Sequence, residues 1–125
     1  MFKRIDHVEI VPSDIERSLE FYTSILGFKF KERFPVANPP MKEVAFVRLG
    51  DTMLELISVQ DPAPPTKPWE VGYRSMAIEV DDMDAAVEDL KKKGIAITWG
   101  PVTLGKSKRA EIQDPDGLTI ELRQW

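Results

Sequence analysis

The feature of this sequence that most constrains its fold is an internal repeat. Displacing the chain by 66 residues lays Gly50–Leu56 (GDTMLEL) on Asp116–Leu122 (DGLTIEL). A displacement of 68 residues lays His7 on Ser75 near the start of each half. Because the halves of such a repeat each bury a face that they cannot cover alone, the pattern predicts two related modules that pack against each other.

Both halves show the same order of expected elements. The expected strands are 6–11, 28–31, 44–49, 52–59, 73–80, 95–98, 109–113 and 118–122, from apolar alternation and the turn residues between them. The first helix follows the capping box Ser13–Glu16, with Ser13 as the N-cap, and ends at Gly27. The second follows Asp81 or Asp82, has an apolar stripe at helical spacing, and ends at Gly94.

This order is βαβββ twice, which predicts an α+β fold in which the two modules form a curved, mostly antiparallel open sheet. We expect a single domain with one module at 1–60, a Pro-rich linker at 61–72 and a second module at 73–125. The linker permits the second module to lie beside the first module of its own chain or of another subunit. A homodimer is the expected assembly.

Composition excludes several classes of function. The chain has 125 residues and a formal net charge of −4, which argues against a nucleic-acid partner because phosphate binding needs a basic surface. No apolar run has the length of a membrane span, and the first residues lack the apolar core of a signal peptide. The absence of cysteine excludes disulfides and thiolate chemistry. The expected location is the cytoplasm.

The candidate site begins with His7, the only histidine. Strand alternation places His7 and Glu9 on one face of the first strand. Glu55 and Glu121 stand among apolar residues at equivalent positions of the repeat. If the halves pack with pseudo-twofold symmetry, these two carboxylates, His7 and Ser75 face one cleft, a plausible site for a divalent metal. Alternatively, the histidine is a structural hydrogen-bonding residue and the glutamates lie on solvent-exposed strand faces.

Four segments together resemble the glyoxalase I family and, more broadly, the vicinal oxygen chelate superfamily. They are DHVEIVPSDIERSLEFYTSILGF, GDTMLEL, AIEVDD and DPDGLTIEL. The resemblance implies metal positions at His7, Glu55, Ser75 and Glu121, and one Ni, Co or Zn ion. Ser75 departs from the family pattern, in which a histidine is usual. The ion would therefore keep three protein ligands and a water, or the metal has been lost.

The resemblance also implies a reaction. It is proton transfer next to a carbonyl, as in lactoylglutathione lyase or an acyl-CoA epimerase, with Glu121 as the base and Glu55 as the second choice. The expected substrate is a small molecule, a glutathione hemithioacetal or a CoA thioester. Basic residues that would meet its anionic groups are Arg48, Arg74, Lys106, Lys108, Arg109 and Arg123.

The alternative is a metal-free protein that binds small molecules, of the bleomycin and drug-resistance type. An apolar cup would then hold an aromatic or amphipathic ligand. Its expected lining is Phe46, Met53, Ile57, Tyr73 and Met76.

Overall fold

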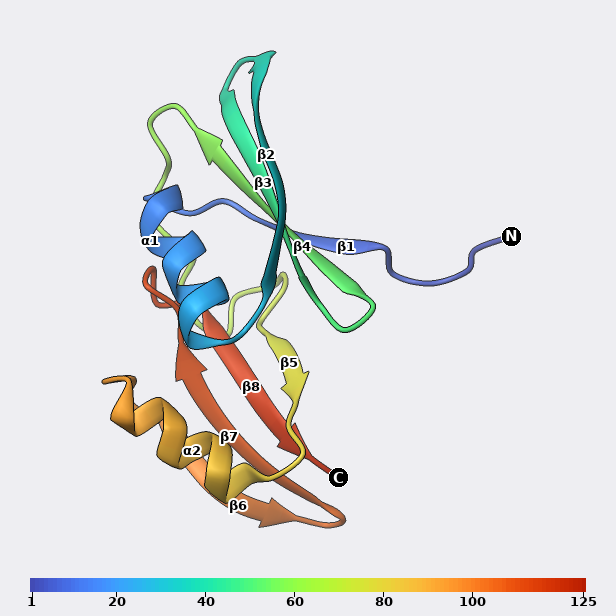
Figure 1. Cartoon of the computed structure of the whole chain (residues 1–125), viewed down its shortest axis with the longest axis vertical. Helices are drawn as coiled ribbons and strands as arrows, with labels where there is room; N and C mark the ends of the chain where they lie inside the picture. The colour runs from blue at the N-terminus through green and yellow to red at the C-terminus, as the bar shows by residue number, and fades with distance from the viewer. The chain divides into compact units, whose positions relative to one another are not determined.

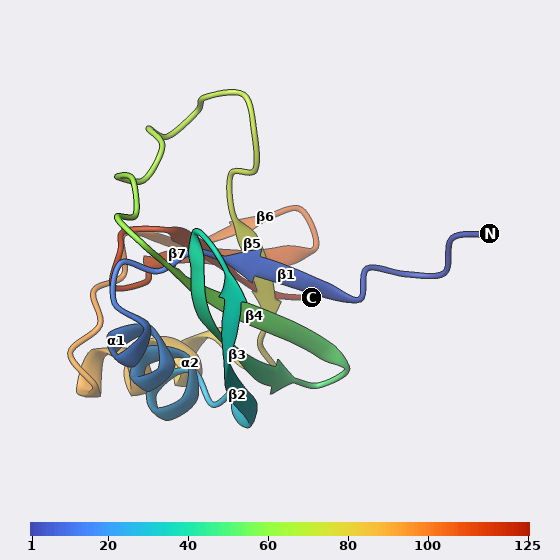
Figure 2. The ribbon, with the colours of Figure 1, turned by 90° about the horizontal axis from the view of Figure 1, so that it is seen from above.

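The computed structural model describes all 125 residues and divides into two compact units, Met1–Pro64 and Pro65–Trp125. Each unit contains one four-stranded sheet and one helical segment (Figure 1). The segment between the last strand of the first unit and the first strand of the second has no helix or strand, as Figure 2 shows.

The first unit contains β1 (His7–Ile10), α1 (Ile15–Glu20), the π-helical turn η1 (Phe21–Ile25), β2 (Lys29–Asn38), β3 (Met41–Leu49) and β4 (Thr52–Val59). Its strand order is β1-β4-β3-β2, with β1 parallel to β4 and the other pairs antiparallel.

The second unit contains β5 (Met76–Glu79), α2 (Met83–Lys92), β6 (Trp99–Leu104), β7 (Ser107–Gln113) and β8 (Thr119–Gln124). Its order, β5-β8-β7-β6, again has one parallel pair. The predicted α+β fold of two βαβββ modules is therefore confirmed, with one mostly antiparallel sheet in each unit.

The registers of the two sheets repeat the sequence offsets. Glu9 pairs with Glu55 between β1 and β4, and Ala77 pairs with Glu121 between β5 and β8. Glu55 and Glu121 thus occupy the same ladder position in the two units. Ala77 occupies the position of Glu9, so the second unit has only one of these two carboxylates.

One face of each sheet forms the core. In the first unit α1 packs on β4, and in the second α2 packs on β8. The strand residues buried on these faces are Ala45, Val47, Leu54 and Leu56 in the first unit, and Ala110, Ile112, Ile120 and Leu122 in the second. Because side chains alternate along a strand, Glu55 lies on the face opposite to the buried leucines of β4.

The start of the first helix differs from the prediction by one residue. The N-cap is Asp14 rather than Ser13, and its Oδ1 accepts hydrogen bonds from the backbone N–H groups of Glu16 at 3.0 Å and Arg17 at 3.3 Å. Asp14 has an extended backbone, so its carboxylate faces the free N–H groups of the first turn. The predicted end at Gly27 is confirmed by a φ of 83°.

The strand predicted at 95–98 is wrong, because the segment begins by capping the C-terminus of α2, which ends at Lys92. The N–H of Ile95 donates to the carbonyl of Leu90 at 2.9 Å, and β6 begins only at Trp99. The strand predicted at 28–31 extends as β2 to Asn38, and it includes Pro35, which an edge strand tolerates. The strand predicted at 73–80 is shorter, Met76–Glu79.

The longest helix, α2, has 10 residues. No helix combines the length and the apolar character that crossing a membrane would need.

Candidate metal centre

Two neighbouring strands of the first unit bring three candidate ligands to one place. His7 and Glu9 are two residues apart on β1, so their side chains leave the same face of the strand. Glu55 on β4 is the register partner of Glu9. Parallel neighbours lie about 4.8 Å apart, which is within reach of two carboxylates and an imidazole.

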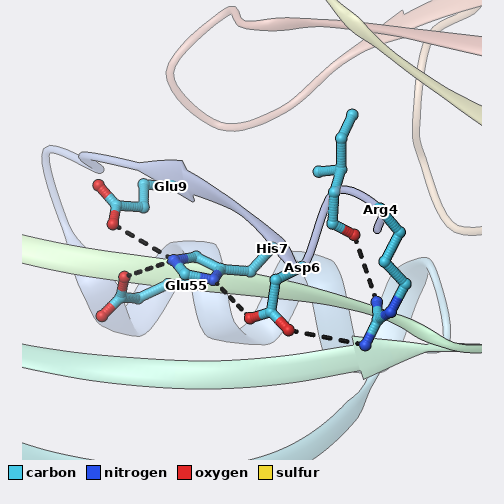
Figure 3. A network of polar contacts seen from close by, with 6 residues as sticks. Arg4, Asp6, His7, Glu9 and Glu55 are labelled. Atoms are coloured by element: carbon cyan, nitrogen blue, oxygen red, sulfur yellow. Dashed lines mark hydrogen bonds and ion pairs between the residues drawn. The ribbon is translucent and has the colours of Figure 1, made fainter. Parts of the chain in front are cut away.

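The imidazole lies at the centre of this group (Figure 3). His7 Nε2 is 3.3 Å from Glu9 Oε1 and 3.5 Å from Glu55 Oε2, and one donor atom from each of the three residues lies within 4.8 Å of the others. On the other side of the ring, Nδ1 is 2.9 Å from Asp6 Oδ2. The two ring nitrogens therefore have separate partners.

Burial and charge set the protonation of the group. Burial raises the pKa of Glu55, whose side chain is 13% exposed, and the nearby Glu9 carboxylate raises it further. The hydrogen bond that His7 makes to the Asp6 carboxylate is the main cause that raises the pKa of His7, and the hydrogen bond with Glu9 adds to it. The concentration of negative charge around one imidazole favours a bound cation, whether a proton or a metal ion.

The donor set fits a divalent metal ion. Imidazole nitrogen and carboxylate oxygen are ligands of Zn²⁺, Ni²⁺ and Co²⁺. Ligand atoms that each lie about 2.1 Å from one ion are roughly 3 to 3.5 Å apart. The spacings from His7 Nε2 to the two glutamates, 3.3 and 3.5 Å, fall in this range.

Asp6 orients the ring for such a role. Metal-ligating histidines usually donate their second ring N–H to a carboxylate, which fixes the tautomer. Asp6 accepts in this way from Nδ1, and Arg4 lies 3.6 Å from the other Asp6 oxygen. The arrangement leaves Nε2 of His7 directed at Glu9 and Glu55 (Figure 3).

Replacing Asp6 by asparagine should lower the pKa of His7 in the metal-free protein. The carboxylate stabilises the protonated imidazole, so its loss moves the pKa down toward the ordinary value. NMR titration of the ring protons measures this directly because the chain has a single histidine. Asp51→Asn, the same charge change at an exposed turn of the first unit, is the matched control. An unchanged His7 pKa in Asp6→Asn would contradict this role for Asp6.

The second unit presents its candidate residues differently. Ser75 is exposed and immediately precedes β5. Glu121 on β8 is held by Arg123, whose Nε donates to Oε2 at 3.1 Å and whose Nη2 donates to Oε1 at 3.3 Å. The structure thus brings together His7 and Glu55 of the predicted ligands, and the grouping of Ser75 and Glu121 with them stays a prediction.

Sequence reasoning placed Glu9 on the face of His7 but gave it no role. The missing signal is the strand register, because only pairing with Glu55 shows that Glu9 lies against the same donors. Phe46 continues this row on β3, where it pairs with Glu55. Its ring meets the His7 ring edge-on at 6.3 Å and stacks on Phe34 at 6.3 Å. The site therefore has an apolar border.

Several of the predicted basic partners are already engaged. Arg74 pairs with Glu111 at 2.9 Å, and Arg109 donates to Ser107. Arg48 donates to the carbonyl of Gly50 and lines a cavity of about 320 Å³ in the first unit. The lining of that cavity is Gly27, Lys29, Lys31, Arg48, Leu49 and Gly50.

The family is shown by comparison with known proteins. Residues 4–122 match the model of the Glyoxalase/Bleomycin resistance protein/Dioxygenase superfamily. The chain belongs to this superfamily. The predicted resemblance is confirmed, and so is the predicted plan of two βαβββ units.

Relatives of known name support the same assignment. The mitochondrial methylmalonyl-CoA epimerase of Homo sapiens is 35% identical over 97% of this glyoxalase-superfamily chain and 73% of the relative. The lactoylglutathione lyase of Neisseria meningitidis is 34% identical over 97% of this chain and 90% of the relative. A solved glyoxalase family protein from Enterococcus faecalis superposes with a TM-score of 0.82, at 30% identity, over 98% of both chains.

Proposed function

We propose that this chain is a metal-dependent lyase or isomerase that transfers a proton next to a carbonyl. The observation that carries the proposal is the convergence of two carboxylates on Nε2 of the only histidine, in a chain similar to an epimerase and a lyase. A structural histidine needs one hydrogen-bond partner on each nitrogen. Here Nε2 faces two carboxylates while Asp6 holds Nδ1.

The proposed ligand set is His7, Glu55 and Glu121, with Ser75 at the fourth position beside the ion or bridged to it by water. The repeat supports this set, since Glu55 and Glu121 hold the same ladder position in their units. Three protein ligands and an open position are the usual arrangement of a catalytic site.

Within this site each residue has a separate proposed role. A bound divalent cation supplies Lewis-acid stabilisation of negative charge on the oxygens of the substrate. His7 on β1 and Glu55 on β4, whose side chains lie 3.5 Å apart on paired strands, would hold the ion. Glu121 takes the proton next to the carbonyl, and Arg123 holds its carboxylate in one orientation between turnovers. Glu55 is the second choice for the base.

The proposed substrates carry anionic groups away from the reacting carbon, as a glutathione hemithioacetal or a CoA thioester does. The basic cavity of the first unit is a suitable place for such a group. Arg48 is separated from His7 by one intervening register position, Met53 on β4. Two strand spacings place the Cα of Arg48 roughly 10 Å from the Cα of His7 across the sheet.

The test is turnover by protein loaded with Ni²⁺, Co²⁺ or Zn²⁺. One assay uses the hemithioacetal of methylglyoxal and glutathione, and a second uses methylmalonyl-CoA. Running both in deuterated water reports proton transfer itself, because solvent deuterium enters the carbon next to the carbonyl. Absence of both product and deuterium exchange with every metal would overturn the proposed reaction.

A second function is favoured by two observations. Ser75 is a poor metal ligand, and Arg123 occupies both oxygens of Glu121. A protein without the metal would bind an aromatic or amphipathic small molecule against Phe46, Met53 and Ile57. The superfamily includes bleomycin resistance proteins, as its name states. Tight binding of bleomycin to metal-free protein, together with no turnover, would favour this function.

Ser75→His should strengthen metal binding. It supplies a nitrogen donor at the position where the family pattern has one, so we expect affinity to rise by about tenfold or more, in line with the effect of single groups at metal sites. Calorimetric titration of the variant and the wild type with Zn²⁺ measures the difference. Ser58→His, on β4 of the first unit, is a control for a histidine placed elsewhere. Unchanged affinity in Ser75→His would show that residue 75 lies away from the ion.

We also propose that the protein works as a cytoplasmic homodimer, since the linked modules suit pairing about a twofold axis. Light scattering at micromolar concentration measures the assembly, and a monomer would contradict it.

A further inference from the structure

Glu9 has no part in the ligand set proposed above, yet it is as close to the imidazole as Glu55 is. Resting on the proposed function, we propose that Glu9 is a direct ligand of the cation. The first unit would then supply three ligands, His7, Glu9 and Glu55, without help from the second. Glu9 would compensate for the histidine that is missing at Ser75.

The backbone places Glu9 for this role. His7 and Glu9 leave the same face of β1, and the register sets Glu9 directly beside Glu55 of β4. Glu9 Oε1 lies 3.3 Å from His7 Nε2, slightly nearer than Glu55 Oε2 at 3.5 Å. One small cation can therefore touch all three donors without a change in the strands.

Charge on the exposed face of this sheet points the same way. Three other strand carboxylates are each paired with an arginine: Glu43 with Arg33, Glu111 with Arg74 and Glu121 with Arg123. No lysine or arginine forms an ion pair with Glu9 or Glu55. The basic partner of both carboxylates is His7.

His7 cannot neutralise the group by itself. It also pairs with Asp6 at 2.9 Å, so three carboxylates surround one imidazole, with Arg4 reaching only Asp6. A divalent cation would balance the excess negative charge that a single proton on the ring leaves behind.

The second unit has no counterpart of the Glu9 carboxylate. Its equivalent in the second unit is Ala77, beside Glu121, so the extra carboxylate exists in one half only. The half with the extra carboxylate also holds the histidine, whereas the half without it has Ser75 in place of a histidine. Under this proposal, Glu9 supplies from the first unit the ligand that Ser75 does not supply from the second.

The test is calorimetric titration with Zn²⁺ alone, supported by the visible absorption of the Co²⁺-loaded protein. Glu9→Gln should lower Zn²⁺ affinity by about tenfold or more and change the Co²⁺ bands, because a charged donor is replaced by a weaker neutral one. The side chain of Glu9 is 58% exposed, so the substitution leaves the core intact. Glu20→Gln, at an exposed position of α1, removes the same charge and is the matched control.

The outcomes separate this inference from the function on which it rests. If the wild type binds one Zn²⁺ and Glu9→Gln binds it equally well with an unchanged Co²⁺ spectrum, Glu9 is no ligand and the proposed function stands. An equal loss in Glu20→Gln would mark a long-range charge effect and also overturn the inference. A wild type that binds no metal would overturn both.

Discussion

Glu121→Gln should lower turnover by about 10²- to 10⁴-fold, the usual contribution of a positioned general base. An amide oxygen can still ligate a metal but cannot accept the proton from carbon. Zn²⁺ affinity should therefore fall by only about tenfold, far less than turnover, because a neutral oxygen donor replaces a charged one among several ligands. Steady-state assays on both substrate classes and calorimetry on the same preparation measure the two effects.

Glu111→Gln is the matched control for this prediction. Glu111 lies opposite Glu121 on β7, on the same face, and it is likewise paired with an arginine, Arg74. We expect it to keep most of the activity. If Glu121→Gln retains activity while Glu55→Gln loses it, the base belongs to the first unit and the division of roles proposed above is reversed.

His7→Ala should lower metal affinity by about 100-fold or more, because a ligand contributes at least as much as the outer-shell groups whose loss costs 10- to 100-fold. His7 is the only nitrogen donor and stands between the two glutamates and Asp6. Its removal leaves only carboxylate ligands at the site. Zn²⁺, Ni²⁺ and Co²⁺ all bind well to imidazole, so the affinity for each should fall. Activity that depends on the metal should fall with it.

Calorimetric titration with each of the three metals measures the loss. The ring is partly exposed, with 32% of the side chain accessible, so alanine at this position should leave the core of β4 and α1 in place. Circular dichroism and a thermal melt check this. A His7→Ala protein that is folded and binds Zn²⁺ as tightly as the wild type would show that the metal, if any, lies elsewhere.

The elements that could be predicted from sequence are those whose signals are local. For α2, the N-cap Asp82, the buried stripe of Met83, Val87 and Leu90, and the closing Gly94 with a φ of 79° are all as expected. Strand β4 has the predicted bounds, Thr52–Val59, because its alternation is bordered by a tight turn. The α+β plan followed from recognising the repeat.

The errors arose where non-local contacts decide. Whether residues 95–98 or 99–104 form a strand depends on where the chain meets β7, and local propensity does not report this. The same holds at the site. The position of Glu9 beside Glu55 depends on strand register, and the pairing of Glu121 with Arg123 depends on side-chain direction. Alternation in the sequence suggests both but does not fix them.

The most direct test of the account is an NMR titration of the wild type with Zn²⁺, observed at the ring of His7. The chain has one histidine, so its signals need no assignment among alternatives. We predict a shift of the imidazole resonances that is complete at one equivalent of Zn²⁺ per chain, with Nε2 as the coordinated nitrogen and Nδ1 still protonated toward Asp6. Imidazole resonances that stay unchanged through several equivalents of Zn²⁺ would contradict the metal site and the function built on it.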